Sequence, residues 1–163
     1  MSKQAGNILN VTLTLVAIYL YSFTANNIET EIFGFNSFKF LITVAVLIQF
    51  LIFLPSYIFK TEKFYDLTGS LTYISVTSIA YFSLENPTTT DTILFLYVVI
   101  WAGRLGIFLF RRINKDGKDE RFDKAKKKFF WFLQYWMGQA AWVVFTAGAV
   151  SYTHLTLPTT YHV

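Results

Sequence analysis

Five long apolar stretches constrain the fold of this chain more than any other feature of its sequence. They are Ile8–Phe23, Phe40–Phe59, Leu67–Leu84, Thr92–Phe110 and Phe129–Ala149. A helix needs roughly 20 residues to cross about 30 Å of hydrocarbon, and most of the stretches approach that length, the first being the shortest. Continuous apolarity over such lengths favours helices over strands. The sequence therefore predicts an all-α fold, a polytopic membrane bundle of about five transmembrane helices.

Composition supports this prediction. Only 15% of the residues are charged and 54% are hydrophobic, whereas soluble domains carry about 25% charged residues. The length fits one compact unit. Cysteine is absent, which excludes disulfides, thiolate metal ligands and cysteine nucleophiles. We expect no metal site, because the only histidines, His154 and His162, lie in a polar C-terminal segment.

The charges between the apolar stretches predict the topology. Residues 24–37 and 85–91 contain two acids each and no Lys or Arg, whereas residues 60–66 contain two lysines. Residues 111–128 carry nine Lys or Arg against four acids. By the positive-inside rule, the N-terminus and the 111–128 segment face the cytoplasm. We expect an integral protein of a bacterial inner membrane or of the endoplasmic reticulum.

The string WAGRLGIFLFRR places one arginine within an apolar stretch. Helical spacing puts Trp101 and Arg104 near one face, with Arg111 about two turns further along. Gly103 and Gly106 would let a helix or a ligand approach closely. Arg104 is therefore either part of an anion site for a cofactor phosphate or a snorkelling side chain, since the predicted helix end is only about 9 Å away.

The basic segment 111–128 also has two interpretations. Topology and anionic headgroups suffice to explain Lys126–Lys128. The portion INKDGKDERFD instead interleaves acids and bases around Gly117. This pattern predicts an ordered loop with internal ion pairs that presents Arg111, Arg112 and Arg121 to a phosphate. Nucleic-acid binding is not expected of so short a loop beside a membrane.

Polar residues in the third and fifth stretches suggest roles inside the bundle. Asp66, in KTEKFYDLTGSLTY, either caps a helix or binds an arginine or a ligand. Gly69 and Ser70 allow close helix approach, and Gln134 and Gln139 are expected to hydrogen-bond between helices.

Three strings, TEKFYDLTGSLTYISVT, WAGRLGIFLFRRINKDGKDERFD and QAAWVVFT, resemble a membrane protein family of unassigned function that is grouped with the steroid 5-alpha-reductase C-terminal domain. The resemblance runs from about Thr61 to Ala149. It implies a membrane reductase that uses NADPH to saturate a carbon–carbon double bond conjugated to a carbonyl in a steroid- or lipid-like small molecule. The resemblance further implies a cofactor site that contains Arg104, Arg111, Arg112 and Arg121. The expected substrate pocket contains Asp66, Trp101 and Gln139.

One position departs from the more distant steroid reductases. These enzymes have a tyrosine one helical turn before an arginine comparable to Arg104, and here that residue is Trp101. An indole does not donate a proton as a phenol does, so the catalytic residue is left unassigned. Two alternatives stay open: a membrane methyltransferase similar to isoprenylcysteine methyltransferases, and a non-enzymatic lipid-binding membrane protein.

The C-terminal segment VSYTHLTLPTTYHV is unlike the rest of the chain. The codons GTC TCT TAT ACA CAT CTG ACG CTG CCG ACG encode VSYTHLTLPT, and that DNA resembles a transposase adapter used to prepare sequencing libraries. We therefore expect residues 1–149 to be the N-terminal part of a reductase-like domain, and residues 150–163 to be translated adapter. On this hypothesis the last helix stops at Ala149, and the chain lacks the family's arginine-histidine-proline-asparagine-tyrosine stretch and does not turn over substrate.

Overall fold

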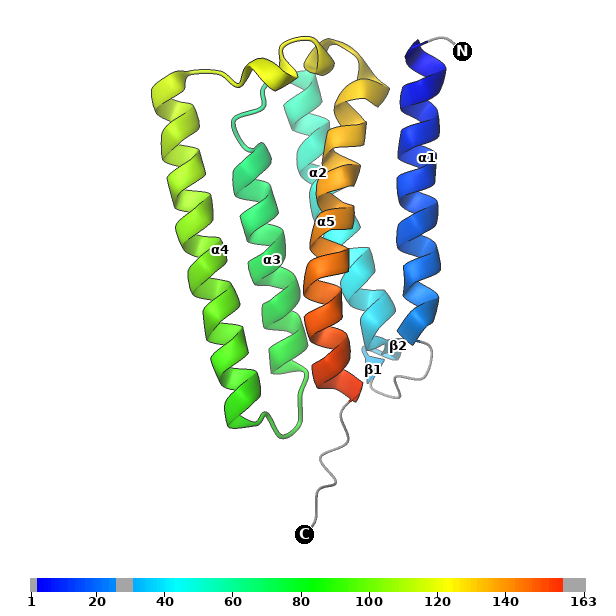
Figure 1. Ribbon diagram of the computed structural model, residues 1–163, viewed down its shortest axis with the longest axis vertical. Coiled ribbons are helices and arrows are strands. Elements are labelled where there is room, and N and C mark those ends of the chain that lie inside the picture. The colour runs from blue at the N-terminus through cyan, green and yellow to red at the C-terminus, as the bar shows by residue number, and fades with distance from the viewer. Residues whose placement is uncertain (1–2, 26–30, 157–163) are drawn as a thin grey trace.

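The computed structural model describes residues 3–25 and 31–156, and it confirms the all-α prediction (Figure 1). Five long helices lie side by side in one bundle: α1 Lys3–Ser22, α2 Ser37–Ile58, α3 Tyr65–Phe82, α4 Thr89–Asp116 and α5 Phe129–Thr156. The remaining elements are short: two strands, β1 Glu31–Ile32 and β2 Phe35–Asn36, and three 3₁₀ helices, η1 Phe23–Ala25, η2 Glu120–Phe122 and η3 Ala125–Lys127.

Three of the five helices, α1, α2 and α4, are long and apolar enough to cross a membrane, by a search of the described residues. They indicate a membrane protein. Helix α3 packs against α2, α4 and α5. Three of its hydroxyl groups, on Thr68, Ser70 and Thr72, donate to backbone carbonyls one turn back, so these three are satisfied locally.

Several helix boundaries that were predicted from hydropathy are wrong. Helix α1 begins at Lys3 rather than Ile8 and therefore has 20 residues. Helix α4 runs from Thr89 to Asp116 rather than from Thr92 to Phe110. A capping box between Thr88 and Asp91 fixes its start, and Gly117, at φ +80°, ends it in the left-handed conformation. Hydropathy marks where apolar residues end, whereas these helices continue into charged sequence.

The expectation that the last helix stops at Ala149 is also wrong. Helix α5 continues to Thr156, so the backbone does not change at the boundary where the adapter segment was proposed to begin. Pro158 and His162 lie outside the described residues. That residues 150–163 are translated adapter stays a prediction, which resequencing of the locus tests.

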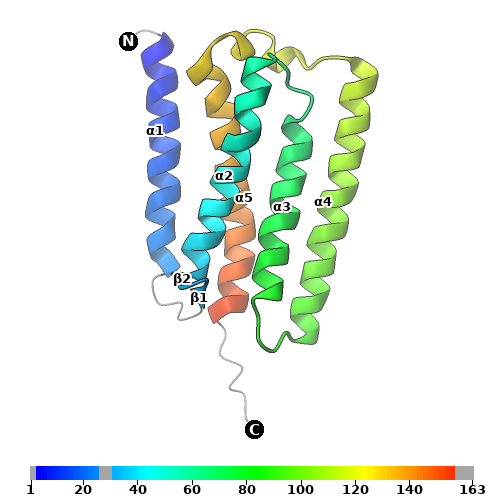
Figure 2. The same cartoon turned by 180° about the vertical axis from the view of Figure 1, so that it is seen from behind.

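The bundle has two chemically different ends. The loop end carries the start of α1, residues 59–64 and residues 117–128, and lies at the top of Figure 1. The hairpin end carries β1, β2 and residues 83–88 and lies at the bottom of both views (Figures 1 and 2). The strongly basic segment and the lysines of residues 59–64 are thus at the loop end, as the predicted topology requires. Which side of the membrane each end faces stays a proposal.

The β-hairpin leads directly into α2. Strands β1 and β2 pair antiparallel across Phe33 and Gly34, both of which have positive φ, as tight two-residue hairpin turns require. Asn36 then caps α2, because its side-chain oxygen accepts a hydrogen bond of 3.1 Å from the Lys39 N–H.

Helix α5 organises the core, since it packs against α1, α2 and α3. Glycines allow the closest helix contacts, as the sequence predicted for Gly69 and Gly106. A Cβ built at Gly106 would lie 2.7 Å from Cβ of Ser70 on α3, and one at Gly69 would lie 2.5 Å from Nε2 of Gln139 on α5. Gly103 has open space beside it instead, so the predicted close approach of a helix is wrong there, and approach of a ligand stays a prediction.

Candidate functional site

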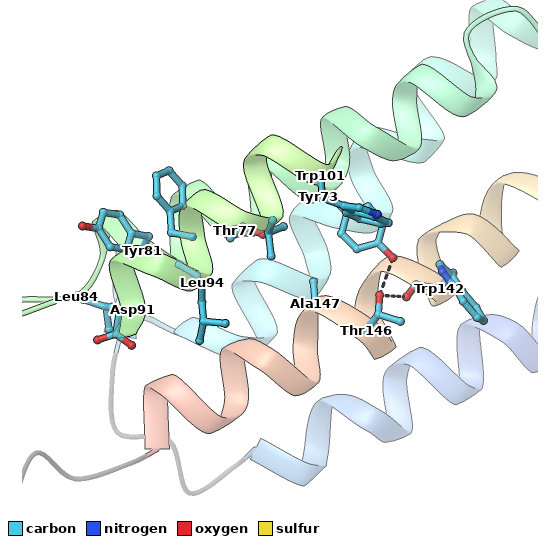
Figure 3. Close-up of a pocket in the computed structure, with 13 residues that line it drawn as sticks. Tyr73, Thr77, Tyr81, Leu84, Asp91, Leu94, Trp101, Trp142, Thr146 and Ala147 are labelled. Carbon is cyan, nitrogen blue, oxygen red and sulfur yellow. Dashed lines mark hydrogen bonds between the residues drawn. The ribbon is translucent and has the colours of Figure 1, made fainter. Parts of the chain in front are cut away.

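A cavity of about 370 Å³ opens between α3, α4 and α5 in the half of the bundle nearer the hairpin end (Figure 3). We call it the apolar cavity. Its lining consists mainly of aromatic and aliphatic side chains: Tyr73, Thr77, Ala80, Tyr81, Leu84, Asp91, Leu94, Phe95, Val98, Trp101, Trp142, Thr146 and Ala147. Such a lining suits a largely apolar ligand that carries few polar groups.

One hydrogen-bonded pair supplies the polar feature of the cavity on the side of Trp101. The Tyr73 hydroxyl lies 2.6 Å from Oγ1 of Thr146 (Figure 3). The Thr146 hydroxyl in turn donates a hydrogen bond of 2.7 Å to the Trp142 carbonyl. Because the Thr146 proton is directed to Trp142, Tyr73 donates to Thr146. The Trp101 ring meets the Tyr73 ring edge-on at 5.2 Å. A tyrosine on α3 therefore lies against Trp101, one of the predicted pocket residues.

The polar groups toward the hairpin end of the cavity are engaged elsewhere. The Tyr81 hydroxyl lies 3.0 Å from Oγ1 of Thr92, and the Tyr81 ring stacks on Phe95 at 4.5 Å. The Asp91 carboxylate accepts bonds from the backbone N–H and the hydroxyl of Thr88 at 2.8 and 2.6 Å. These contacts occupy Tyr81 and Asp91, so the polar side chains of the lining that remain for a ligand are Thr77 and the Tyr73–Thr146 pair, of which the pair lies nearer Trp101.

A buried carboxylate ties the basic segment to the bundle at the loop end. Glu62 has a side chain that is only 4% exposed, and its Oε2 lies 2.8 Å from Nζ of Lys126. Its other oxygen accepts a 3.1 Å bond from the Asp119 N–H. Burial lowers the pKa of Lys126, but hydrogen bonds and charge from Glu62 and Asp123 outweigh burial, so the pKa is raised overall. Glu62 was not predicted from the sequence, because it is a single acid in the short connection between α2 and α3.

Aromatic packing against the bundle also holds the basic segment in place. Phe122 is 1% exposed, and its ring lies 4.9 Å from that of Tyr65 and 5.0 Å from that of Tyr135. The Tyr65 hydroxyl donates a 3.1 Å bond to the Tyr135 carbonyl. Lys118 and Lys126 both pair with Asp123 at 3.5 Å. The predicted ordered loop with internal ion pairs is confirmed.

Two of the predicted arginines line an open cleft of about 420 Å³ at the loop end, which we call the arginine cleft. Its lining is Arg112, Ile113, Asp116, Lys118, Asp119, Glu120 and Arg121. Arg121 makes charge-assisted hydrogen bonds to Asp119 through Nε and Nη2. These bonds raise the pKa of Arg121 and lower that of Asp119.

Asp66 pairs with Arg112, whose Nη2 lies 3.8 Å from the carboxylate. The N-cap position of α3 is Phe64, and no side chain caps it. Of the two interpretations of Asp66, helix capping is therefore wrong and binding of an arginine is confirmed. The carboxylate still lies in the first turn, where the helix dipole favours a negative charge.

The arginine cleft offers oriented donors without an excess of positive charge. Three cations and three carboxylates line it. Asp119 holds one edge of the Arg121 guanidinium, and Nη1, on the other edge, makes no hydrogen bond to the described residues. The Arg121 side chain is 58% exposed. Arg121 can therefore bind a phosphate oxygen through this edge while Asp119 fixes its orientation.

The other two predicted arginines, Arg104 and Arg111, are exposed and line neither hollow. Neither forms an ion pair within residues 3–25 and 31–156. Arg104 lies about 18 Å along the axis from the end of α4 at Asp116, twice the distance that the predicted boundary gave. The added turns are charged, and the apolar stretch still ends at Phe110, about 9 Å from Arg104, so the snorkelling interpretation stays a prediction.

The two glutamines of α5 differ. Gln134 accepts a long hydrogen bond of 3.4 Å from Asn10 on α1, which confirms the predicted contact between helices. Gln139 packs against Gly69, and its buried Oε1 has no hydrogen-bond partner among the described residues. Of the three predicted pocket residues, Trp101 lines the apolar cavity, whereas Asp66 and Gln139 do not.

A family described as "Protein of unknown function (DUF1295)" matches residues 52–162, more than half of the chain. The chain belongs to the DUF1295 family. The DUF1295 match begins within α2 and includes every residue that lines the apolar cavity and the arginine cleft. It also extends across most of the segment 150–163. No curated protein and no solved structure matches the chain.

Proposed function

We propose that this DUF1295 protein is an integral-membrane oxidoreductase that uses NADPH to reduce a carbon–carbon double bond conjugated to a carbonyl in a steroid- or lipid-like substrate. The observation that carries the proposal is the apolar cavity with the Tyr73–Thr146 pair in its wall. A lipid-like substrate would fill the cavity, and its carbonyl oxygen would be the one polar group that needs a donor.

Tyr73 would provide that donor. In the resting protein its hydroxyl donates to Thr146. A carbonyl oxygen that reached the pair would accept the Tyr73 O–H in place of Thr146, and this bond strengthens as negative charge develops on the oxygen. The surrounding apolar side chains exclude water, which increases the electrostatic effect of the bond. This role makes Tyr73 the candidate catalytic residue that the sequence did not supply.

The cofactor proposal rests on the arginine cleft and on the family resemblance. Arg112 and Arg121 are the residues that would hold a phosphate of NADPH, with Arg121 binding through its free edge. When bound, NADPH supplies a hydride. The proposal places the loop end, and with it the N-terminus, in the cytoplasm, where NADPH is available and where basic segments are retained.

The test begins by resequencing the locus, and it uses the protein encoded there, purified in lipid nanodiscs. NADPH is expected to raise its unfolding temperature, and S-adenosylmethionine is not. With NADPH and an α,β-unsaturated lipid ketone, Tyr73→Phe is expected to lower turnover by about 10²-fold or more. Tyr97→Phe is the matched control, because Tyr97 on α4 is 69% exposed and lies outside the cavity.

Two outcomes would replace the proposal with the alternatives that the sequence left open. Stabilisation by S-adenosylmethionine alone would favour the methyltransferase. Stabilisation by neither cofactor, together with binding of an apolar ligand in the cavity, would favour a non-enzymatic lipid-binding protein. Equal turnover by the Tyr73 and Tyr97 variants would remove Tyr73 from the mechanism.

A further inference from the structure

A second hollow at the loop end has a different chemical character from the arginine cleft. It has a volume of about 570 Å³ and lies between the first turn of α1 and the first turn of α5, which run side by side (Figures 1 and 2). We call it the lysine groove. Its lining is Lys3, Gln4, Asn7, Lys128, Phe129, Phe130 and Trp131.

The charge in the lysine groove is entirely positive. Lys3 and Lys128 line it, no carboxylate does, and neither ammonium group forms an ion pair within the described part of the chain. The arginine cleft, in contrast, contains as many carboxylates as cations. Of the two hollows at this end, the lysine groove is therefore the one with unneutralised charge, and it would attract an anion more strongly.

The neutral lining residues favour a lipid as the source of that anion. Two amides, on Gln4 and Asn7, offer hydrogen bonds beside the lysines, and three aromatic residues, Phe129, Phe130 and Trp131, follow where α5 begins its apolar run. Polar groups above aromatic rings are typical of the membrane–water boundary. A groove at this level meets lipid headgroups and the first part of the acyl chains together.

We propose that the lysine groove binds the headgroup of an anionic phospholipid. Lys3 and Lys128 bind the phosphate oxygens, the amides donate to headgroup oxygens, and the acyl chains pass along the aromatic residues. The first turn of α5 adds backbone N–H groups that have no partner inside the helix. The lipid would join α1, which lies outside the family match at residues 52–162, to α5, which lies within it.

The test measures lipid binding by the purified protein in detergent, using native mass spectrometry and the unfolding temperature. Phosphatidylglycerol is expected to bind and to raise the unfolding temperature at concentrations where phosphatidylcholine does not. Removing both lysines by Lys3→Ala and Lys128→Ala is expected to weaken phosphatidylglycerol binding about 25-fold, or roughly fivefold for each lysine.

The matched control removes two other lysines of the loop end, by Lys124→Ala and Lys127→Ala. Both residues are exposed, unpaired within the described residues and absent from the groove, so this variant is expected to bind within about twofold of the original protein. Unfolding temperatures without lipid show that both variants fold.

Three results would overturn the proposal. Equal binding of phosphatidylcholine and phosphatidylglycerol would remove the role of charge. Equal losses in the two double variants would assign the effect to general surface charge rather than to the groove. Binding of inorganic phosphate as tight as that of phosphatidylglycerol would assign the site to a soluble anion.

Discussion

The two ends of the bundle are held together by different kinds of contact. At the loop end, ion pairs join segments distant in sequence, and the buried Glu62 contacts both Lys126 and the Asp119 backbone. Toward the hairpin end, apolar walls surround the cavity, and hydroxyl pairs such as Tyr73–Thr146 provide its few polar contacts. The comparison indicates that ion pairs position the basic segment, whereas apolar side chains define the cavity. Substitutions at each end, and between them, test this division.

The largest effect is expected from Glu62→Ala. The substitution leaves Lys126, whose side chain is 19% exposed, without its closest carboxylate. Removing one member of a largely buried pair typically costs about 3 kcal/mol or more. We expect a loss of that size in the free energy of unfolding, measured by denaturant titration in bicelles.

Glu120→Ala is the control for Glu62→Ala. Glu120 is an exposed acid of the same segment with no ion pair among the described residues, so its loss is expected to change the unfolding free energy by less than about 0.5 kcal/mol. Equal effects of the two substitutions would mean that charge at the loop end does not position the segment.

Between the two ends of the bundle, Gly106 on α4 lies against Ser70 on α3. Gly106→Ala would bring a Cβ to 2.7 Å from Cβ and Oγ of Ser70, and overpacking of this kind costs about 1–3 kcal/mol. Gly103→Ala, three residues earlier on the same helix, meets nothing within 4 Å. It should be neutral or stabilise by up to about 1 kcal/mol, because alanine favours a helix. Thermal unfolding of the two variants checks the difference.

These residues also show what sequence could predict. Apolar runs, basic segments and small residues identified the helices, the two ends and the close contacts at Gly69 and Gly106, because these properties are local or periodic. Glu62 was missed, because its partner Lys126 is distant in sequence and only the fold brings them together. The pairing of Tyr73 with Thr146 was missed for the same reason, although Tyr73 closes the string YDLTGSLTY that carried the family resemblance.

A smaller effect is expected for the hydroxyl pair in the apolar cavity. Tyr73→Phe and Thr146→Val each remove one side of the 2.6 Å contact, and hydrogen bonds between membrane helices contribute about 0.6 kcal/mol on average. A double-mutant cycle on the unfolding free energy should give a coupling of that size. A coupling near that of the Glu62–Lys126 pair would contradict the view that polar contacts matter less for stability at this end.

The smallest effect is expected from Asp119, and it depends on pH. Hydrogen bonds from Arg121 lower the pKa of Asp119 in the folded protein, below an unfolded value of about 3.9. Its stabilising contribution is therefore complete above the unfolded pKa and is lost as pH falls through the folded pKa. Because the Arg121 side chain is 58% exposed, we expect Asp119→Asn to cost only about 0.5 kcal/mol near neutral pH.

That cost should shrink as the pH is lowered from about 7 to about 3, because protonation removes the same charge from the original protein. Asp116→Asn is the control, since Asp116 lines the same cleft without an ion pair among the described residues. A cost for Asp119→Asn that stays constant over this range would show that the carboxylate acts through its shape and not its charge. In that case the loop end would resemble the hairpin end, where side-chain shape rather than charge sets the contacts, more closely than its ion pairs suggest.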